Sequence, residues 1–274
     1  MTHAHQRTYT PLVVWLAAAV VALAGAAPAH AQAAAGDARV FVTVNGGLQT
    51  LTSGFSEDIV FTESGGAYPT DRGVISDATA QEESRFESDY RFENSTLFDV
   101  SGGVRVAPYF ALGVGMSRFM SEETAGVSAQ VPHPIFFDRN RSISGPSPPL
   151  TREETAIHLQ ALVVLPLTRS FTVTGFGGPT FFEVQQQLVT DVNFTHAYPY
   201  ETAEFASAVT SRESAEATGF NVGVDVAFYF TGNVGVGWLT RYSRATVELP
   251  SASGETLDIE AGGLHTTVGL RLRF

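Results

Sequence analysis

The chain has 274 residues, no cysteine and a formal net charge of −12. The lack of cysteine excludes disulfides, thiolate nucleophiles and cysteine-ligated metals. Because phosphate binding requires a basic surface, the acidic balance argues against nucleic acid as a partner.

The N-terminus has the features of a secretory signal peptide. A short polar region with Arg7 precedes an apolar run over residues 12–27, and Ala29-His30-Ala31 forms a small-residue cleavage site. The run is short for a spanning helix, which needs about 20 apolar residues, so a permanent anchor is the weaker interpretation. We therefore expect residues 1–31 to be cleaved and residues 32–274 to form one mature domain.

Segments of the mature chain alternate apolar residues with polar or small ones, which is the period-2 pattern of a strand with two different faces. In chain order they cover residues 38–51, 86–106, 109–119, 151–166, 171–190, 220–230, 234–243 and 257–274. This gives eight strands. The second segment is unusually long and keeps one phase throughout. Because a membrane-spanning strand needs only about 9–11 residues, we expect about half of this segment to project beyond the bilayer. A hairpin at Asn94-Ser95 is the alternative, and it would raise the count to ten.

The connections alternate in length. Short turns cover residues 107–108, 167–170 and 231–233, whereas the other connections cover residues 52–83, 119–150, 191–213 and 250–256. The second long connection is rich in proline, which is expected to exclude central strand structure. The third is rich in aromatic residues. Together the longer connections hold 15 acidic residues and four Arg, so they predict a negative rim that attracts cations or basic partners.

The last segment ends on Leu270, Leu272 and Phe274 at alternate positions. This end resembles the C-terminal strand of Gram-negative outer-membrane β-barrels, in which a terminal Phe after alternating apolar residues is the signal read by the barrel-insertion machinery. The even strand count and the alternating connections extend the resemblance to small barrels of the OmpA/OmpX/OmpW type.

That resemblance implies an all-β fold, an antiparallel up-and-down transmembrane β-barrel of eight strands with long external loops. It also implies a location in the cell outer membrane, contact with outer-membrane lipid and lipopolysaccharide, and assembly by the insertion machinery. We expect a monomer. No peptidoglycan-binding domain follows the barrel in this sequence, so tethering to the cell wall is not expected.

If the aliphatic faces contact lipid, the polar faces fill the lumen, which in eight strands is just wide enough for side chains. Buried charges must be paired or hydrated, so we expect a polar network there. Its predicted members are Asp99, Arg105, Asp225, Arg241, Arg271 and Arg273. The network is either a narrow ion path or a satisfied polar core that closes the barrel.

No catalytic, cofactor or metal site is expected. His158 and His265 fall on the inward face, but neither lies in a motif with a serine and an acid. No phosphate loop, zinc motif or calcium loop is found. Two functions stay open: a structural or surface-interaction barrel acting through its external loops, and a narrow channel or conduit for small, including hydrophobic, molecules. A soluble lipocalin-like carrier, with aliphatic faces inward, is the third and weakest alternative.

Overall fold

The computed structural model describes residues 39–50, 54–64, 68–70, 73–75, 81–91, 95–136 and 139–274. The predicted signal peptide lies outside this part of the chain. Eight strands form the main sheet: β1 (Val40–Thr50), β6 (Ser95–Ala107), β7 (Phe110–Glu123), β10 (Leu150–Pro166), β11 (Phe171–His196), β12 (Ala203–Tyr229), β13 (Val234–Pro250) and β14 (Thr256–Arg273). Six more are β2 (Phe55–Ser64), β3 (Tyr68–Thr70), β4 (Gly73–Ile75), β5 (Gln81–Tyr90), β8 (Gly126–Val131) and β9 (Arg141–Pro146). Within these ranges no helix is long and apolar enough to cross a membrane.

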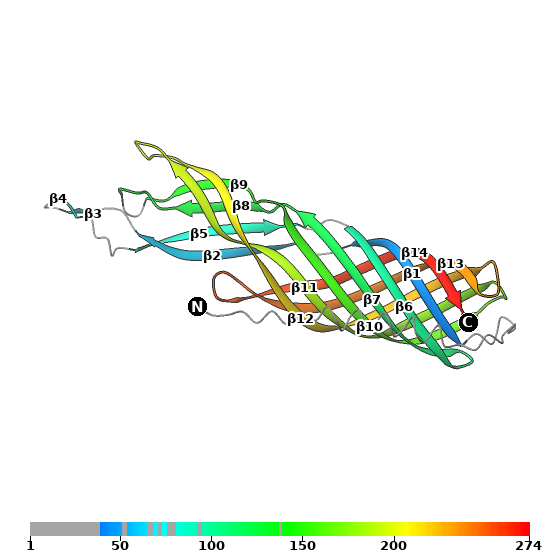
Figure 1. Ribbon diagram of the computed structural model, residues 1–274. Coiled ribbons are helices and arrows are strands. Elements are labelled where there is room, and N and C mark those ends of the chain that lie inside the picture. Colours follow the sequence, from blue (N-terminus) through cyan, green and yellow to red (C-terminus); the bar gives the residue numbers. More distant parts are fainter. Residues whose placement is uncertain are drawn as a thin grey trace.

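The main sheet closes into a barrel in the order β1-β14-β13-β12-β11-β10-β7-β6, with every neighbouring pair antiparallel (Figure 1). The first and last strands meet: the N–H of Phe274 donates to the carbonyl of Val40 at 2.8 Å. The predicted eight-stranded, up-and-down barrel is therefore confirmed. The ten-stranded alternative is not realised, because β5 pairs with β2 and β8 outside the ring.

A band of apolar side chains encircles the barrel near its short turns. From Phe220 in β12 to Phe230 directly after it, the outward residues are aliphatic or aromatic, and most are about half exposed. At about 3.3 Å per residue and a tilt of about 45°, this stretch gives a height of roughly 23 Å, close to the ~25 Å apolar belt of transmembrane barrels. The aliphatic face points outward, opposite to the lipocalin arrangement.

Beyond that band the apolar face changes sides. In β13, Trp238 points outward within the band, whereas further along the strand the outward residues Arg244 and Glu248 are polar. The inward residues Val247 and Leu249 are both 0% exposed. The same strands thus form a barrel with an apolar outer surface at one end. At the other end they have a polar outer surface and a buried apolar core, as in a water-soluble protein.

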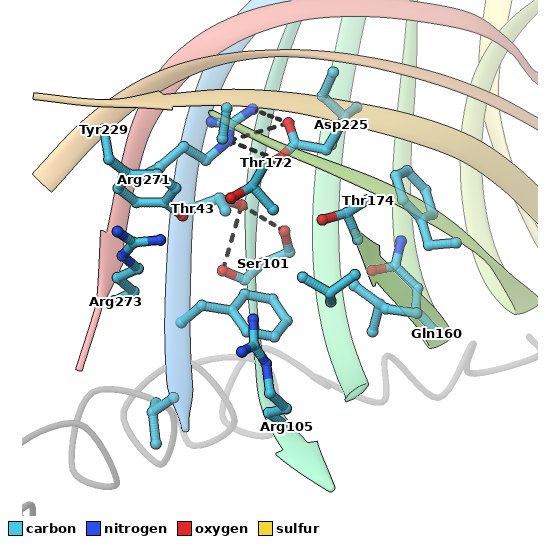
Figure 2. Close-up of a pocket in the computed structure, with 17 residues that line it drawn as sticks. Thr43, Ser101, Arg105, Gln160, Thr172, Thr174, Asp225, Tyr229, Arg271 and Arg273 are labelled. Atoms are coloured by element: carbon cyan, nitrogen blue, oxygen red, sulfur yellow. Dashed lines mark hydrogen bonds and ion pairs between the residues drawn. The ribbon is translucent and has the colours of Figure 1, made fainter. Parts of the chain in front are cut away.

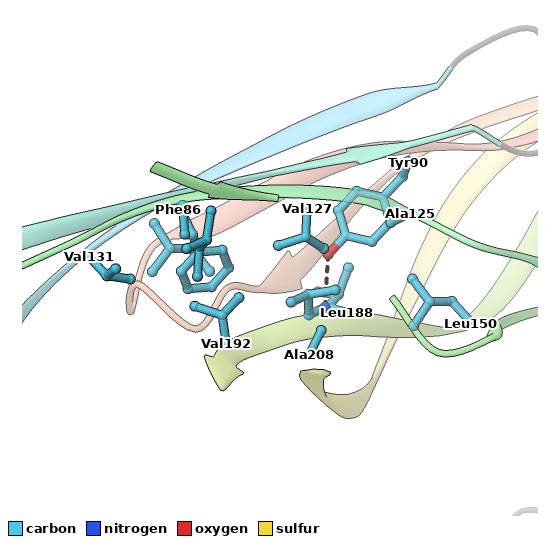
Figure 3. Close-up of a cluster of buried hydrophobic side chains, with 13 residues drawn as sticks. Phe86, Tyr90, Ala125, Val127, Val131, Leu150, Leu188, Val192 and Ala208 are labelled. Atoms are coloured by element: carbon cyan, nitrogen blue, oxygen red, sulfur yellow. Dashed lines mark hydrogen bonds between the residues drawn. The ribbon is translucent and has the colours of Figure 1, made fainter. Parts of the chain in front are cut away.

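The part beyond the band, here called the extension, consists of the sheet β2-β5-β8-β9 and the outer lengths of β11–β14 (Figure 1). β11 and β12 have 26 and 27 residues, whereas about 9–11 suffice to cross a bilayer. Strand β9 lies against β12, so the small sheet packs on the long hairpin. Figure 3 shows the core between them, which contains Phe86, Tyr90, Val127, Leu188 and Val192.

The extension corrects the prediction of one long strand over residues 86–106. Strand β5 ends at Tyr90, and β5 and β6 belong to different sheets. Phe86 is buried in the extension, whereas Phe98 points outward from the barrel. A strand face buried in a protein core and a strand face in contact with lipid both require apolar residues. A constant period in the sequence therefore cannot distinguish the two.

The boundaries of the long connections were also predicted wrongly. Strand structure is present in the proline-rich stretch, because β7 continues to Glu123 and β8 and β9 follow. The prolines lie where they remove no central hydrogen bond: Pro132 directly follows β8 and Pro146 is the last residue of β9. In the third connection, only residues 197–202 separate β11 from β12. The first connection contributes β2, β3, β4 and the start of β5.

Candidate functional site

The lumen at the level of the apolar band contains two ion pairs. Arg241 Nη1 donates to Asp99 Oδ2 at 2.7 Å, and both side chains are 0% exposed. Asn45, the cross-strand partner of Asp99 in β1, donates from Nδ2 to Asp99 Oδ1 at 2.9 Å. The guanidinium carbon of Arg241 also lies 5.5 Å from the centre of the Phe176 ring.

The second pair joins Arg271 of β14 to Asp225 of β12. Arg271 donates from Nε to Asp225 Oδ2 at 3.0 Å and from Nη2 to Oδ1 at 2.5 Å, which is a bidentate contact. Arg271 Nη1 donates to Asn45 Oδ1 at 2.5 Å, so Asn45 connects the two pairs. Gly237 makes room for this side chain, since an added Cβ would lie 2.6 Å from Arg271 Nε.

The other two predicted lumen residues lie nearer the short turns. Arg273 donates from Nε to the carbonyl of Gly232 at 2.7 Å, and its guanidinium lies 3.7 Å from the centre of the Tyr229 ring. Arg105 lines the same end of the lumen. The structure therefore connects Asp99, Asp225, Arg241 and Arg271 through Asn45, and places Arg105 and Arg273 at the mouth.

Towards the extension lies a third buried pair that the sequence reasoning missed. Arg152 Nε donates to Glu154 Oε1 at 2.8 Å. Glu154 Oε2 accepts from Gln49 Nε2 at 3.0 Å and from the N–H of Gly262 at 2.9 Å. Both charged residues share the inward face of β10 with His158, at even spacing, so the period-2 pattern could have identified them.

His158 forms a hydroxyl-bridged layer between these pairs. Its Nε2 lies 2.9 Å from Ser117 Oγ and its Nδ1 lies 2.9 Å from Thr180 Oγ1. The ring is fully buried. A hydroxyl, that of Thr180, occupies the position at which a Ser–His–Asp triad has its orienting carboxylate.

Apolar side chains fill the lumen around the third pair and beyond it towards the extension. This layer, called the apolar plug, consists of Ala156, Phe182, Val184, Ala245, Val247, Leu249, Ile259 and Ala261. All are buried, so the interior is filled from the charged layers into the extension. The described residues contain no group of three His, Asp or Glu side chains that could hold a metal ion.

The predicted insertion-signal residues lie at the opposite end. Leu270 and Phe274 point outward and are about half exposed, and Leu272 is partly exposed between them. They belong to the apolar band, next to the junction of β14 with β1. Their reading by the insertion machinery stays a prediction.

At the far end of the extension, aromatic rings and a cation from two hairpins meet. This tip cluster consists of His133, Phe136, Arg139, His196, Tyr198 and Tyr200. The Arg139 guanidinium lies 5.7 Å from the centre of the Phe136 ring, and Arg139 pairs with Glu201 at 2.7 Å. Tyr198 is 84% exposed and Phe136 is 45% exposed, so the cluster presents aromatic surface to solvent.

His133 shapes one side of the tip cluster. Its Nδ1 accepts the N–H groups of Ile135 and Phe136, each at 3.1 Å, which requires a neutral ring with an unprotonated Nδ1. Burial lowers the pKa of His133 below its ordinary value, and the cations Arg141 and Arg139 lower it further. The loop that carries Phe136 is therefore stabilised by a histidine that stays uncharged.

Comparisons with known proteins agree with the barrel. Residues 18–271 match the family model described as outer membrane protein beta-barrel domain. Among solved structures, the chain is similar to the outer membrane protein OprG from Pseudomonas aeruginosa, with 10% identity, 86% of this chain and 96% of that chain covered, and a TM-score of 0.43. It is also similar to Ail, the attachment invasion locus protein of Yersinia pestis, with 8% identity, coverage of 85% and 99%, and a TM-score of 0.31.

A third similar structure is the outer membrane protease OmpT from Escherichia coli, with 10% identity, coverage of 87% and 97%, and a TM-score of 0.42. A search of curated proteins finds no match. The match to the family model covers most of the sequence, and the described strands form the barrel that the family requires. The chain belongs to the outer membrane protein beta-barrel domain family and resides in the cell outer membrane of a Gram-negative envelope.

Proposed function

We propose that this protein is a non-conducting surface barrel that holds a folded extension outside the cell, as a monomer, and contacts an external protein through the tip cluster. In outer-membrane barrels short turns face the periplasm, which places the extension outside. No catalysis is part of the proposal.

The observation that carries it is the closed interior. The Asp99–Arg241 pair is fully buried, and Val247 and Leu249 of the apolar plug are fully buried above it. An ion entering from outside would have to displace the apolar plug and then lose its water against buried charges, which costs several kcal/mol per ion, on the order of the penalty for buried ions in proteins. We therefore expect a barrel with this interior to hold the extension and not to conduct ions.

The tip cluster supports the surface-interaction half of the proposal. Tyr, Phe and Arg are the residues that most often anchor protein interfaces, because they bury large areas and offer polar groups as well. Tyr198 and Phe136 are exposed at the tip, and ring contacts with Tyr200 and His133 hold them in place. Such a preordered surface loses little side-chain entropy on binding.

Planar-bilayer recording of the refolded protein tests the closed lumen. We expect a folded, heat-modifiable barrel that inserts without current steps. Steps that disappear in Arg241→Ala would overturn the proposal and establish a narrow channel.

Whole-cell adhesion tests the surface role. Cells producing the protein should adhere to at least one member of a panel of immobilised proteins, and the double substitution Phe136→Ser with Tyr198→Ser should reduce this adhesion about tenfold, the size of effect for two interface anchors. Val60→Ser removes exposed apolar surface elsewhere in the extension and is the matched control. Equal adhesion by producing cells and cells without the protein, or by the double variant and the parent, would overturn the role of the tip.

A further inference from the structure

The periplasmic mouth of the barrel contains a cavity of about 70 Å³. Figure 2 shows its polar residues, which come from strands on several sides of the lumen and lie around one space. The cavity is separate from the extension and the tip cluster, and the Asp99–Arg241 pair and the apolar plug lie between them along the barrel. Any ligand of this cavity therefore enters from the periplasm.

One side of the cavity is apolar. Leu162, Val164, Phe176 and Leu239 form a buried cluster, and all four line the cavity. These side chains offer no hydrogen bonds, so a ligand atom on this side must itself be apolar, because an unpaired polar group there would lose its hydration without compensation.

The other side is cationic. The lining residues include three guanidinium groups, those of Arg105, Arg271 and Arg273, and a single carboxylate, that of Asp225. Asp225 is engaged in the bidentate contact with Arg271. Arg273 donates to the carbonyls of Gly232 and Arg169, which carry only partial charges. Arginine does not lose its proton in proteins, so the lining carries an excess of positive charge.

Hydroxyl groups lie between the two sides. Thr43 Oγ1 and Ser101 Oγ are 2.6 Å apart and hydrogen-bonded, and Thr172 and Thr174 also line the cavity. The cavity thus combines charge-assisted donors, neutral hydroxyls and an apolar wall within a small volume.

We propose that this cavity binds a short-chain monocarboxylate, of the size of acetate or propionate, from the periplasm. The carboxylate would accept a hydrogen bond from Arg273, and the alkyl group would lie against Phe176 and Leu162. Inorganic phosphate fits less well, because its oxygens point in all directions and those facing the apolar wall would have no donor.

Titration calorimetry on the refolded full-length protein, with sodium propionate added at constant ionic strength, tests this assignment. We expect saturable binding of one propionate per barrel. Sodium chloride and sodium phosphate at equal ionic strength should produce no saturable heat. A gel shift on heating checks that every protein sample is folded.

Three substitutions separate the cavity from general electrostatics. Arg273→Gln removes a charge and should weaken propionate binding at least tenfold. Ala227→Leu fills the cavity from its buried wall without a change of charge and should abolish binding, which keeps the test valid if the first variant fails to fold. Arg91→Gln removes an exposed charge of the extension outside the cavity lining and should leave the affinity unchanged. Absence of saturable binding, equal affinity in Ala227→Leu and the parent, or equal binding of phosphate and propionate would each overturn the proposal.

Discussion

The substitution Asp99→Asn removes one charge from the centre of the lumen and keeps the shape of the side chain. Arg241 is then left as a buried cation. Its Nη1 bonds to Asp99 at 2.7 Å, whereas its Nε and Nη2 have no hydrogen-bond acceptor among the described residues. The neighbouring Phe176 ring compensates only in part, by about 2 kcal/mol for a desolvated cation over an aromatic ring.

Removing one partner of a buried ion pair costs roughly 3–5 kcal/mol, because the other charge stays without compensation. We therefore expect Asp99→Asn to lower the free energy of unfolding by about that amount. The double variant Asp99→Asn with Arg241→Met removes both charges and should recover at least ~2 kcal/mol of the loss, since an apolar replacement of a whole buried pair is often close to neutral.

Reversible urea unfolding in lipid vesicles measures these values, with the heat-modifiable gel shift reporting the folded fraction. Asp89→Asn is the matched control: its pair with Arg91 is exposed, so its loss should change the free energy by no more than about 0.5 kcal/mol. If Asp99→Asn costs less than about 1 kcal/mol, the Arg241 guanidinium is hydrated in the native state, and the reasoning for a dry, closed lumen is refuted.

Three further changes probe the network and the extension. Gly237→Ala places a methyl group against Arg271 and should lower the free energy of unfolding by about 1–3 kcal/mol, seen as a lower urea midpoint. Tyr90→Phe removes the hydroxyl that accepts the Val189 N–H at 2.8 Å. The local free energy of opening in the extension should fall by about 1–3 kcal/mol, so hydrogen exchange there should become faster. Hydrogen exchange in the barrel should stay unchanged. Because the pKa of His133 is lowered in the folded protein, the neutral ring contributes stability to the folded loop above about pH 6.5, and this stability is lost as the pH falls through the folded pKa. Protection of the Ile135 amide from hydrogen exchange should therefore decrease on acidification. His133→Asn should remove this pH dependence.

The barrel itself was predictable from the sequence, because its signals are local. Period-2 alternation identifies β12 and β13, and the turn at residues 231–233 between them is short enough to fix their antiparallel pairing. The inward phase also identified Asp99, Asp225, Arg241 and Arg271 as lumen residues. Their partners could not be read from the sequence, since Asp99 and Arg241 are 142 residues apart and meet across the lumen, not along one pair of strands.

The extension was not predictable in the same way. The alternation around Phe86 has the same period and phase as that around Phe98, and only the break after Tyr90 decides that one faces a protein core and the other faces lipid. The aromatic residues of the third connection are evident in the sequence, but their contact with Phe136 depends on tertiary packing between hairpins. The contact between Arg139 and Glu201, 62 residues apart, is an example.

Single strands of this barrel carry apolar residues on one face near the short turns and on the opposite face in the extension, which affects how the chain can be assembled. Before the ring closes, an isolated β13 displays Trp238 on one side and Val247 on the other, so a periplasmic chaperone that covers one side of the strand leaves the other side exposed. Unpaired strands of this kind are prone to aggregation. In the proposed orientation, the outward charges Glu183, Glu216 and Glu248 must also pass the membrane before they can reach water outside. The height of the extension is therefore limited by the assembly pathway as well as by the stability of the finished barrel.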